Sequence, residues 1–334
     1  MNYIGSKQTL SNFIIDTVKD KTGLADFNGI VCGDLFAGTG AIGRSFKSQG
    51  ATVTANDFMY FSYVLNKHLI ENTDTSQIDF SILDHLNNLE GTEGYIYNNY
   101  CAGSGSGRNY FTDYNGKKCD AIRQELEKMR FKINPETYYM ALACLIDSID
   151  KCANTASVYG AFLKHIKKSA EKPLFLQPPA VVSGPRGKVY CADINQLINV
   201  VQGDILYLDP PYNARQYCSN YHMLETIARY DEPEISGVTG LRPAGDQKSH
   251  YCSRNEVTAS FEDLIKKSRY RYIFLSYNNE GLMSLETISE IMSRYGKYSC
   301  VSQEYRRFRA DNDISRNIKA DTTTEYLHCL EKSL

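Results

Sequence analysis

The chain has 334 residues, of which 42% are hydrophobic and 23% charged, as in a globular protein with one large core or a core with an inserted lobe. No stretch reaches the roughly 18 consecutive apolar residues that a membrane span needs. The formal net charge of −2 excludes a protein coated in basic residues, but residues 101–180 hold 12 Lys or Arg against 8 Asp or Glu. We expect any contact with a polyanion in that segment, although a solvated, salt-bridged surface would carry the same charge.

The N-terminus and the cysteines indicate where the protein works. Residues 1–7 show no basic stretch followed by an apolar core, so we expect no secretory signal. The ten cysteines stand singly, without a Cys-x-x-Cys pair, and the six histidines have no ligand spacing beside them. We therefore expect a cytoplasmic protein with reduced thiols and no metal site.

The N-terminal part has the pattern of a doubly wound α/β protein. Residues 30–35 are predicted to form a buried strand, and a glycine turn leads from it to a helix at about 41–48. Residues 51–56 alternate like a second strand, and a helix is expected over 59–71. A strand, a glycine-rich turn, a helix and a second strand are the opening of a Rossmann-like sheet.

The pattern changes over residues 87–185, where we predict an inserted helical lobe. Residues 98–119 are rich in Asn, Gly, Ser and Tyr, which predicts a mobile loop. One helix should begin near Asp120, and a second should have Asn134 as its cap and Pro135 at its first position. A proline-rich stretch closes the lobe.

Strand patterns return in the last third of the chain. The expected strands are 204–209, 271–277, 299–305 and 323–330, the last two as a terminal antiparallel pair. Residues 231–259 predict a second long loop. We expect a mostly parallel sheet formed by residues 1–86 and 186–334, interrupted by the insert at 87–185.

The first chemical motif is the glycine turn after the first strand. Gly38, Gly40 and Gly43 match G-x-G-x-x-G, whose missing side chains let the backbone approach a cofactor. Asp34 at the strand end could meet the cationic amino group of a methionine moiety but would repel a pyrophosphate. Asp57 closes the second strand, where a carboxylate can bind both hydroxyls of a ribose. This set favours S-adenosylmethionine over NAD, although a packing turn alone would also explain the glycines.

The second motif is Asp209-Pro-Pro-Tyr212 at the end of an apolar strand. The prolines stiffen the chain and remove two N–H donors, which leaves the Pro210 carbonyl free beside the Asp209 carboxylate. Two acceptors that bind both hydrogens of a conjugated amine would pull its nitrogen towards tetrahedral geometry and free its lone pair for attack. Tyr212 offers a ring on which a base can stack. A tetrapeptide of this kind usually forms only a turn. At a strand end and after a glycine motif, it indicates a site.

With Tyr3-Ile-Gly-Ser-Lys7 at the N-terminus, these motifs resemble the DNA adenine methyltransferases of the alpha or D12 group. Those enzymes have the order glycine motif, inserted target-recognition region and Asp-Pro-Pro-Tyr, and the resemblance covers about residues 1–85 and 186–334. It implies S-adenosylmethionine as methyl donor and N6 of an adenine flipped out of duplex DNA as acceptor. The catalytic residues it implies are Asp209, Pro210, Pro211 and Tyr212.

The resemblance also implies cofactor contacts by position. Tyr3 and Lys7 would contact the methionine end, Asp57 the ribose, and Asp193 with Ile194 the adenine of the cofactor. Asp193 could instead cap the helix that follows it, and Lys7 could be an ordinary surface lysine. The full implied set is Tyr3, Lys7, Asp34, Phe36, Ala37, Gly38, Gly40, Asp57, Asp193, Ile194 and Asp209.

Candidates for contact with DNA are basic residues in four clusters, some interleaved with aromatic rings that suit an unpaired base. Each is also compatible with an ordinary solvated charge. The candidates are Arg108, Lys117 and Lys118; Lys164, Lys167 and Lys168; Arg215 with Tyr217; and Arg306, Arg307 and Arg309.

We therefore predict a site-specific adenine-N6 methyltransferase that acts on double-stranded DNA as a monomer and protects host DNA beside a restriction endonuclease. The length resembles enzymes that modify CATG. The motifs leave open an N4-cytosine or RNA N6-adenine methyltransferase, because the same acceptor chemistry serves any conjugated amine. They also leave open an NAD-dependent oxidoreductase built on the glycine turn, and a non-catalytic DNA-binding subunit.

Overall fold

The structure, a computed structural model, describes residues 7–306 and 322–333. These residues form two compact units, which we call the sheet unit and the helical unit. Within the described part of the chain, the sheet unit consists of residues 7–58, 182–216 and 247–333, and the helical unit of residues 59–181 and 217–246. None of the helices in this part of the chain combines the length and the apolar character needed to cross a bilayer.

The boundaries of the helical unit differ from those of the expected insert, 87–185. Residues 59–86 and 217–246 also belong to this unit because their apolar side chains share its core. Phe61 and Leu224, for example, are fully buried in the same cluster as Leu145.

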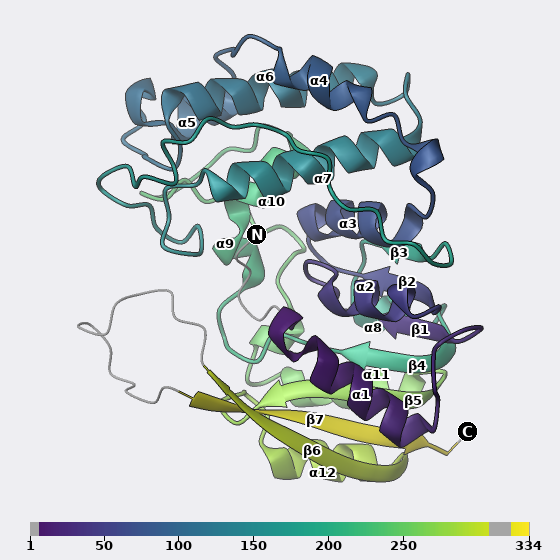
Figure 1. The fold of residues 1–334 in the computed structure, drawn as a ribbon. Helices are drawn as coiled ribbons and strands as arrows, with labels where there is room; N and C mark the ends of the chain where they lie inside the picture. Colours follow the sequence, from purple (N-terminus) through teal and green to yellow (C-terminus); the bar gives the residue numbers. More distant parts are fainter. Residues whose placement is uncertain (1–6, 307–321, 334) are drawn as a thin grey trace. The chain divides into compact units, whose positions relative to one another are not determined.

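The sheet unit contains a seven-stranded mixed sheet with the strand order β3-β2-β1-β4-β5-β7-β6 (Figure 1). The strands are β1 (Val31–Asp34), β2 (Thr52–Asn56), β3 (Lys188–Tyr190), β4 (Gly203–Leu208), β5 (Tyr270–Asn278), β6 (Gly296–Arg306) and β7 (Thr322–Lys332). The first five pair in parallel, and β7 lies antiparallel to both β5 and β6. The predicted fold class, a mostly parallel Rossmann-like sheet with a terminal antiparallel pair, is confirmed.

The strand order reverses between β1 and β4, which creates the crevice where open α/β sheets bind ligands. In the register of this pair Asp34 lies opposite Tyr207, two residues before Asp209. The glycine turn after β1 and the Asp-Pro-Pro-Tyr motif after β4 therefore leave neighbouring strands at the same edge.

The antiparallel strand β7 brings its first residues to this edge as well. Parallel strands end here, whereas an antiparallel neighbour begins here, and Asn278 at the end of β5 pairs with Glu325 near the start of β7. A side chain that is distant in sequence thus reaches the carboxyl edge of the parallel strands.

Helices cover the sheet in two groups whose members contact each other, α1 with α2, and α11 with both α8 and α12. The helical segments of this unit are η1 (Gln8–Leu10), α1 (Ser11–Thr22), α2 (Ala41–Ser48), α8 (Ile194–Leu197), η5 (His250–Cys252), α11 (Val257–Lys267) and α12 (Leu285–Ser293). The apolar faces of α8, α11 and α12 form one core with the strands, in which Leu206, Phe261 and Ile273 are fully buried.

The helical unit contains α3 (Tyr60–Asn66), η2 (Lys67–Glu71), η3 (Thr75–Gln77), α4 (Ser81–Asn87), α5 (Tyr95–Tyr100), η4 (Ala102–Ser104), α6 (Asp113–Met129), α7 (Pro135–Lys151), α9 (Tyr217–Asn220) and α10 (His222–Arg229). The predicted start of α7 is confirmed, because the Asn134 side chain accepts a hydrogen bond from the backbone N–H of Thr137 at 2.8 Å and Pro135 opens the helix. The helix predicted over 59–71 is present as α3, continued by the π-helical turn η2.

The prediction of a mobile loop over 98–119 is wrong. Helix α6 begins at Asp113, capped by the Thr112 hydroxyl, and Gly116 lies inside it. This glycine allows a close approach, since a Cβ there would lie 2.0 Å from the Cys101 sulfur. Composition misled because Tyr100, Tyr110 and Phe111 anchor the segment in the core, where they are fully buried. Polar contacts add to these anchors, among them the bond from Gly103 N–H to the Asp113 carboxylate at 2.7 Å.

Candidate active site

The glycine turn after β1 has the backbone shape that its sequence predicts. Gly38 and Gly40 adopt φ angles of 51° and 78°, a region that side chains disfavour, and Gly40 caps α2. The turn is tied to the end of β2, because Gly38 N–H donates to Asp57 Oδ2 at 2.8 Å and Ala37 N–H donates to the Asn56 carbonyl at 2.9 Å. Asp57, which is partly exposed, thus shapes the turn from the position where a ribose-binding carboxylate was expected.

Asp34 ends β1, as the sequence suggested, and its side chain faces α2. Its side chain is 1% exposed, and Oδ2 accepts a hydrogen bond from Gly43 N–H in the first turn of α2 at 2.8 Å. Burial raises the pKa of this carboxyl to about 7, against the effect of the Gly43 bond, and the charges of Asp209 and Asp57 raise it further. Asp34 therefore has a structural role at the N-terminus of α2, and its expected contact with the amino group of methionine stays a prediction.

A charged cluster surrounds Asp209 at the end of β4. Lys7, which precedes η1, is 4% exposed and donates from Nζ to Asp209 Oδ1 at 2.8 Å and to the Tyr212 hydroxyl oxygen at 2.6 Å. The Glu325 carboxylate on β7 lies 3.3 Å from the same Nζ. Lys7 is therefore no surface lysine, and its Nζ contacts two side chains of the Asp-Pro-Pro-Tyr motif.

The electrostatics of this cluster depend on its burial and on the balance of its charges. Burial alone would lower the pKa of Lys7, but the carboxylates of Asp209 and Glu325 and the phenol of Tyr212 outweigh it and hold the pKa well above its usual range. Burial raises the pKa of Asp209 to about 6, and while the Lys7 charge lowers it, the Glu325 charge raises it. Lys7 thus stays charged, and Asp209 is an unusually basic carboxylate.

The remaining residues of the motif form a rigid wall beside Asp209. Pro210 is buried, and the Tyr212 ring meets the edge of the Tyr277 ring at 5.6 Å between centroids. The Tyr212 carbonyl accepts a hydrogen bond from Leu282 N–H at 3.0 Å, and Lys7 Nζ lies 5.0 Å from the centre of the Tyr212 ring. The ring is therefore fixed in orientation before any ligand arrives.

The residues expected around the adenine of the cofactor have other contacts. The Asp193 carboxylate caps α8 by accepting the Gln196 N–H at 3.1 Å, which is the alternative that the sequence left open. Ile194 is 4% exposed and belongs to the core of the sheet unit. Phe36 is partly buried with its ring against the edge of Tyr251, at 5.0 Å between centroids.

The basic residues of the predicted loop are engaged with the protein. Arg108 donates to three backbone carbonyls, those of Asn99, Gly237 and Val238. Lys117 forms an ion pair with Glu93 at 2.8 Å. Lys118 is 5% exposed and donates to the carbonyls of Asn87 and Leu89, so burial removes it from the set of DNA candidates.

The other DNA candidates differ in exposure. Lys164, Lys168 and Arg215 are exposed, whereas Lys167 is partly buried and donates to the Thr155 carbonyl at 2.6 Å. Tyr217 stacks on Tyr221 at 6.0 Å between ring centroids. Tyr3, Arg307 and Arg309 lie outside the described residues, and only the backbone of Arg306, at the end of β6, is described.

Sequence reasoning missed Glu325 and Asn56. The Asn56 side chain joins three strand ends, because its amide donates to the carbonyls of Leu35 and Ala192 and its oxygen accepts the Ala192 N–H. Asn56 directly precedes Asp57, which is the signal that could have identified it. Glu325 is one of several polar residues in β7, so the sequence gives no such signal for it.

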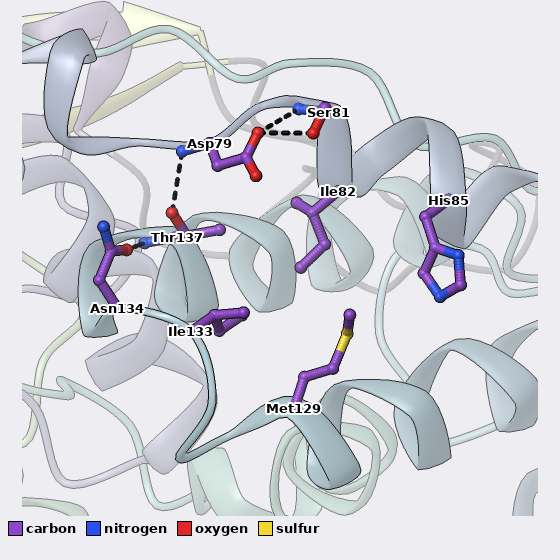
Figure 2. A pocket seen from close by; sticks show the side chains of 8 residues that line it. All are labelled: Asp79, Ser81, Ile82, His85, Met129, Ile133, Asn134 and Thr137. Atoms are coloured by element: carbon purple, nitrogen blue, oxygen red, sulfur yellow. Dashed lines mark hydrogen bonds between the residues drawn. The ribbon is translucent and has the colours of Figure 1, made fainter.

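A cavity of about 330 Å³ in the helical unit contains none of the predicted site residues (Figure 2). Ile82, Met129 and Ile133 form its apolar wall. Its polar groups are used locally: Asp79 accepts hydrogen bonds from the N–H and hydroxyl of Ser81, and Asp79 N–H donates to the Thr137 hydroxyl. These contacts fix the starts of α4 and α7, so we assign the polar groups of this cavity a structural role. Within the described residues, no cluster of three or more His, Cys, Asp or Glu suits a metal ion.

Comparison with known proteins identifies the family of the chain. The family model described as D12 class N6 adenine-specific DNA methyltransferase matches residues 3–291. The chain is 52% identical over 336 residues to the type II methyltransferase M.NlaIII of Neisseria lactamica, with 100% of both proteins covered. It is 37% identical to M.FokI of Planomicrobium okeanokoites, of which it spans only 53%, and 33% identical to M.CviAII of Paramecium bursaria Chlorella virus 1, with 93% of each covered. The chain therefore belongs to the D12 class of N6 adenine-specific DNA methyltransferases.

Proposed function

We propose that Asp209 and the Pro210 carbonyl bind the two hydrogens of the adenine N6 amine, and that the base stacks on Tyr212. The observation that carries this proposal is the Lys7–Asp209 contact at the end of β4, which fixes one carboxylate oxygen, Oδ1. No hydrogen bond from the described residues reaches Oδ2, so this oxygen can accept an amine hydrogen. Withdrawing the amine hydrogens into two acceptors localises the nitrogen lone pair for attack.

The activity follows from the family: the chain is an enzyme that methylates N6 of adenine in DNA, site-specifically and as part of restriction–modification. S-adenosylmethionine is the methyl donor, and it supplies an electrophilic methyl group on a sulfonium. The N4-cytosine, RNA, oxidoreductase and non-catalytic alternatives are thereby set aside.

For the cofactor, we propose the turn from Phe36 to Gly40 as the backbone cradle and Asp57 as the ribose ligand. The residues fit such a group because both glycines of the turn have positive φ and Asp57 is partly exposed beside them. The buried cluster of one ammonium and two carboxylates also suits a cationic donor. Asp193 caps α8, so in this proposal it contacts the adenine of the cofactor only with the part of its carboxylate that does not bond to Gln196.

For DNA, we propose that the helical unit reads the target, with its exposed lysines on phosphates. Lys164 and Lys168 are the exposed cations of its basic segment, and Arg215 is exposed three residues after Tyr212 in the sheet unit. Lysines of this kind contribute affinity that falls with salt rather than specificity.

We further propose that the enzyme works as a monomer in the cytoplasm, modifies CATG and is paired with a restriction endonuclease. Identity along the full length of a type II methyltransferase supports this reading. Mapping N6-methyladenine by single-molecule sequencing of plasmid DNA treated with the pure enzyme would give the target, and a modified site other than CATG would contradict that part.

The mechanism is tested by Asp209→Ala. Loss of the acceptor should lower methyl transfer on the order of 10²-fold or more, with folding intact. Transfer of a tritiated methyl group to duplex DNA measures the rate, and circular dichroism checks the fold. Wild-type turnover in the folded variant would overturn the proposed role of Asp209.

A further inference from the structure

Glu325 is a buried glutamate that the reaction proposed above leaves without a role. It is 0% exposed near the start of β7, and its register partners on the neighbouring strands are the neutral residues Asn278 and Gln303. Its carboxylate Oε1 lies 3.3 Å from Lys7 Nζ. Burying a carboxylate is costly unless a cation compensates it, and the Lys7 ammonium contributes to that compensation.

The cluster contains one ammonium between two carboxylates. A lysine ammonium has three donors, and Asp209, Tyr212 and Glu325 all place an oxygen within 3.3 Å of it. If Lys7 faced Asp209 alone, the two charges would cancel in a buried site, and Asp209 would be a weak acceptor. Glu325 attracts the same ammonium, so the ammonium compensates the charge of Asp209 only in part.

We propose that Glu325 is a positioning residue that shares the Lys7 ammonium with Asp209, so that Lys7 holds the Asp209 carboxylate in place without neutralising it. The inference rests on the proposed function, because it concerns how the acceptor of the amine hydrogen stays basic. Glu325 would act only through Lys7 and would not contact the base itself.

The groups that face Asp209 determine the direction of the effect. Burial raises the Asp209 pKa to about 6, Lys7 lowers it and Glu325 raises it. Tyr207 on β4 also lies in the cluster, but burial holds its pKa above the usual range and its hydroxyl donates to Ser276 at 2.8 Å, so it stays neutral. Asp34 on β1 is a further carboxyl whose pKa responds to the Asp209 charge. Removing the Glu325 charge should therefore lower the pKa of Asp209.

The test is a titration of the cofactor-free, full-length enzyme labelled with ¹³C at aspartate carboxyls. The Asp209 signal is identified by its absence in Asp209→Asn. In Glu325→Gln its midpoint should move to lower pH by on the order of one unit. The matched control is Glu331→Gln on the same strand, since Glu331 is 43% exposed and pairs with Arg271 at 3.0 Å, and this variant should leave the midpoint unchanged.

A second readout is the pH profile of single-turnover methyl transfer. In Glu325→Gln the acid limb should move to lower pH in parallel with the titration, while the plateau rate falls by roughly threefold to tenfold because a less basic acceptor binds the amine hydrogen less strongly. A structural role alone would lower stability without moving the limb. Glu325→Leu, which is also neutral and leaves no buried amide, replaces Glu325→Gln if that variant does not fold.

An unchanged Asp209 midpoint in a folded neutral variant would overturn the inference, as would a shift to higher pH. The titration does not depend on methyl transfer. A shifted midpoint in an enzyme that transfers no methyl group would therefore support the charge sharing while contradicting the proposed function.

Discussion

Each unit of the protein contains a lysine that is buried to almost the same extent, yet the two face different partners. Lys7 in the sheet unit is 4% exposed and faces two carboxylates and a phenol. Lys118 in the helical unit is 5% exposed and donates to the backbone carbonyls of Asn87 and Leu89. The exposed fraction of a lysine therefore does not show whether the lysine contacts the proposed catalytic residues or only stabilises the fold.

The pKa values of the two lysines shift in opposite directions. For Lys7 the neighbouring charges outweigh burial and hold the pKa well above its usual range, whereas burial lowers the pKa of Lys118. Other buried charges of the helical unit also hold backbone: Asp120 accepts the N–H groups of Ile96 and Tyr97, and Arg123 donates to a carbonyl of α10. A buried charge that faces titratable groups can tune them, while one that faces peptide groups fixes the course of the chain.

The largest expected effect is that of Lys7→Met. Without the ammonium, the Asp209 pKa should rise above 6, so that the carboxyl is protonated at neutral pH and cannot accept the amine hydrogen. Methyl transfer at pH 7 should fall on the order of 10²-fold, with part of the loss recovered at pH 9. Single-turnover rates across this pH range measure both effects.

Lys118→Met is the matched control for Lys7→Met. It leaves two carbonyls without a buried donor, which should lower the free energy of unfolding by about 1–3 kcal/mol. The rate per folded molecule should stay at the wild-type value, measured below the melting temperature of the variant. Equal losses of turnover in the two variants would break the distinction between the two lysines.

Asp57→Ala examines a carboxylate that combines both kinds of contact. Asp57 accepts the Gly38 N–H and is also partly exposed at the proposed ribose site. Its loss should weaken binding of S-adenosylhomocysteine by roughly 1.5–3 kcal/mol, measured by isothermal titration. Asp57→Asn, which keeps an acceptor for Gly38, separates the two roles: affinity retained in Asn but lost in Ala would mean that Asp57 only shapes the turn.

The fold could be predicted from the sequence where local patterns and tertiary contacts agree. Strand β1, helix α2 and the capped start of α7 are found within one residue of their expected positions, because glycine, asparagine and proline act locally there. The segment 98–119 could not be predicted. Its order comes from contacts with residues far along the chain. Tyr100, Tyr110 and Phe111 are fully buried in the core of the helical unit, and Arg108 donates to carbonyls at 237 and 238.

The site was predictable in its motifs but not in its charge balance. The sequence placed Asp209 and Lys7 in one pocket by resemblance, and the structure brings them to 2.8 Å. It could not show that Glu325, over 300 positions from Lys7, completes the cluster, because that depends on an antiparallel strand. It also could not show that Asp34 turns towards α2, because a carboxylate at a strand end can point either way.

Asp34→Asn tests a carboxylate with a structural role. The pKa of Asp34 is about 7 in the folded protein, against 3.8 for an ordinary aspartate such as that of the unfolded chain. The native state therefore binds more protons between these values, and wild-type stability falls as pH rises through them. Asparagine keeps an acceptor for Gly43 and does not titrate. The stability of the variant relative to wild type should therefore increase between about pH 4 and pH 7, by on the order of 4 kcal/mol in all.

Urea unfolding of the cofactor-free proteins at a series of pH values gives this difference. Asp209 titrates in both proteins, and its coupling to Asp34 is part of the measured difference. A difference that is constant with pH would contradict the buried, protonated state of Asp34. A tenfold loss of affinity for S-adenosylhomocysteine in the same variant would support the contact with the methionine end that the sequence suggested.

The smallest expected effects concern the basic segment of the helical unit, which contains both kinds of lysine within five residues. Lys164 and Lys168 are exposed, whereas Lys167 donates to the Thr155 carbonyl and burial lowers its pKa. Replacing Lys164 and Lys168 with Gln should weaken binding to duplex DNA several-fold and reduce the slope of log affinity against log salt by about one for each phosphate that is no longer neutralised. Lys167→Met should instead lower stability and leave the salt slope unchanged. Fluorescence anisotropy over a salt series measures the slope, and if the exposed pair can be neutralised without changing it, the DNA surface of this enzyme lies elsewhere.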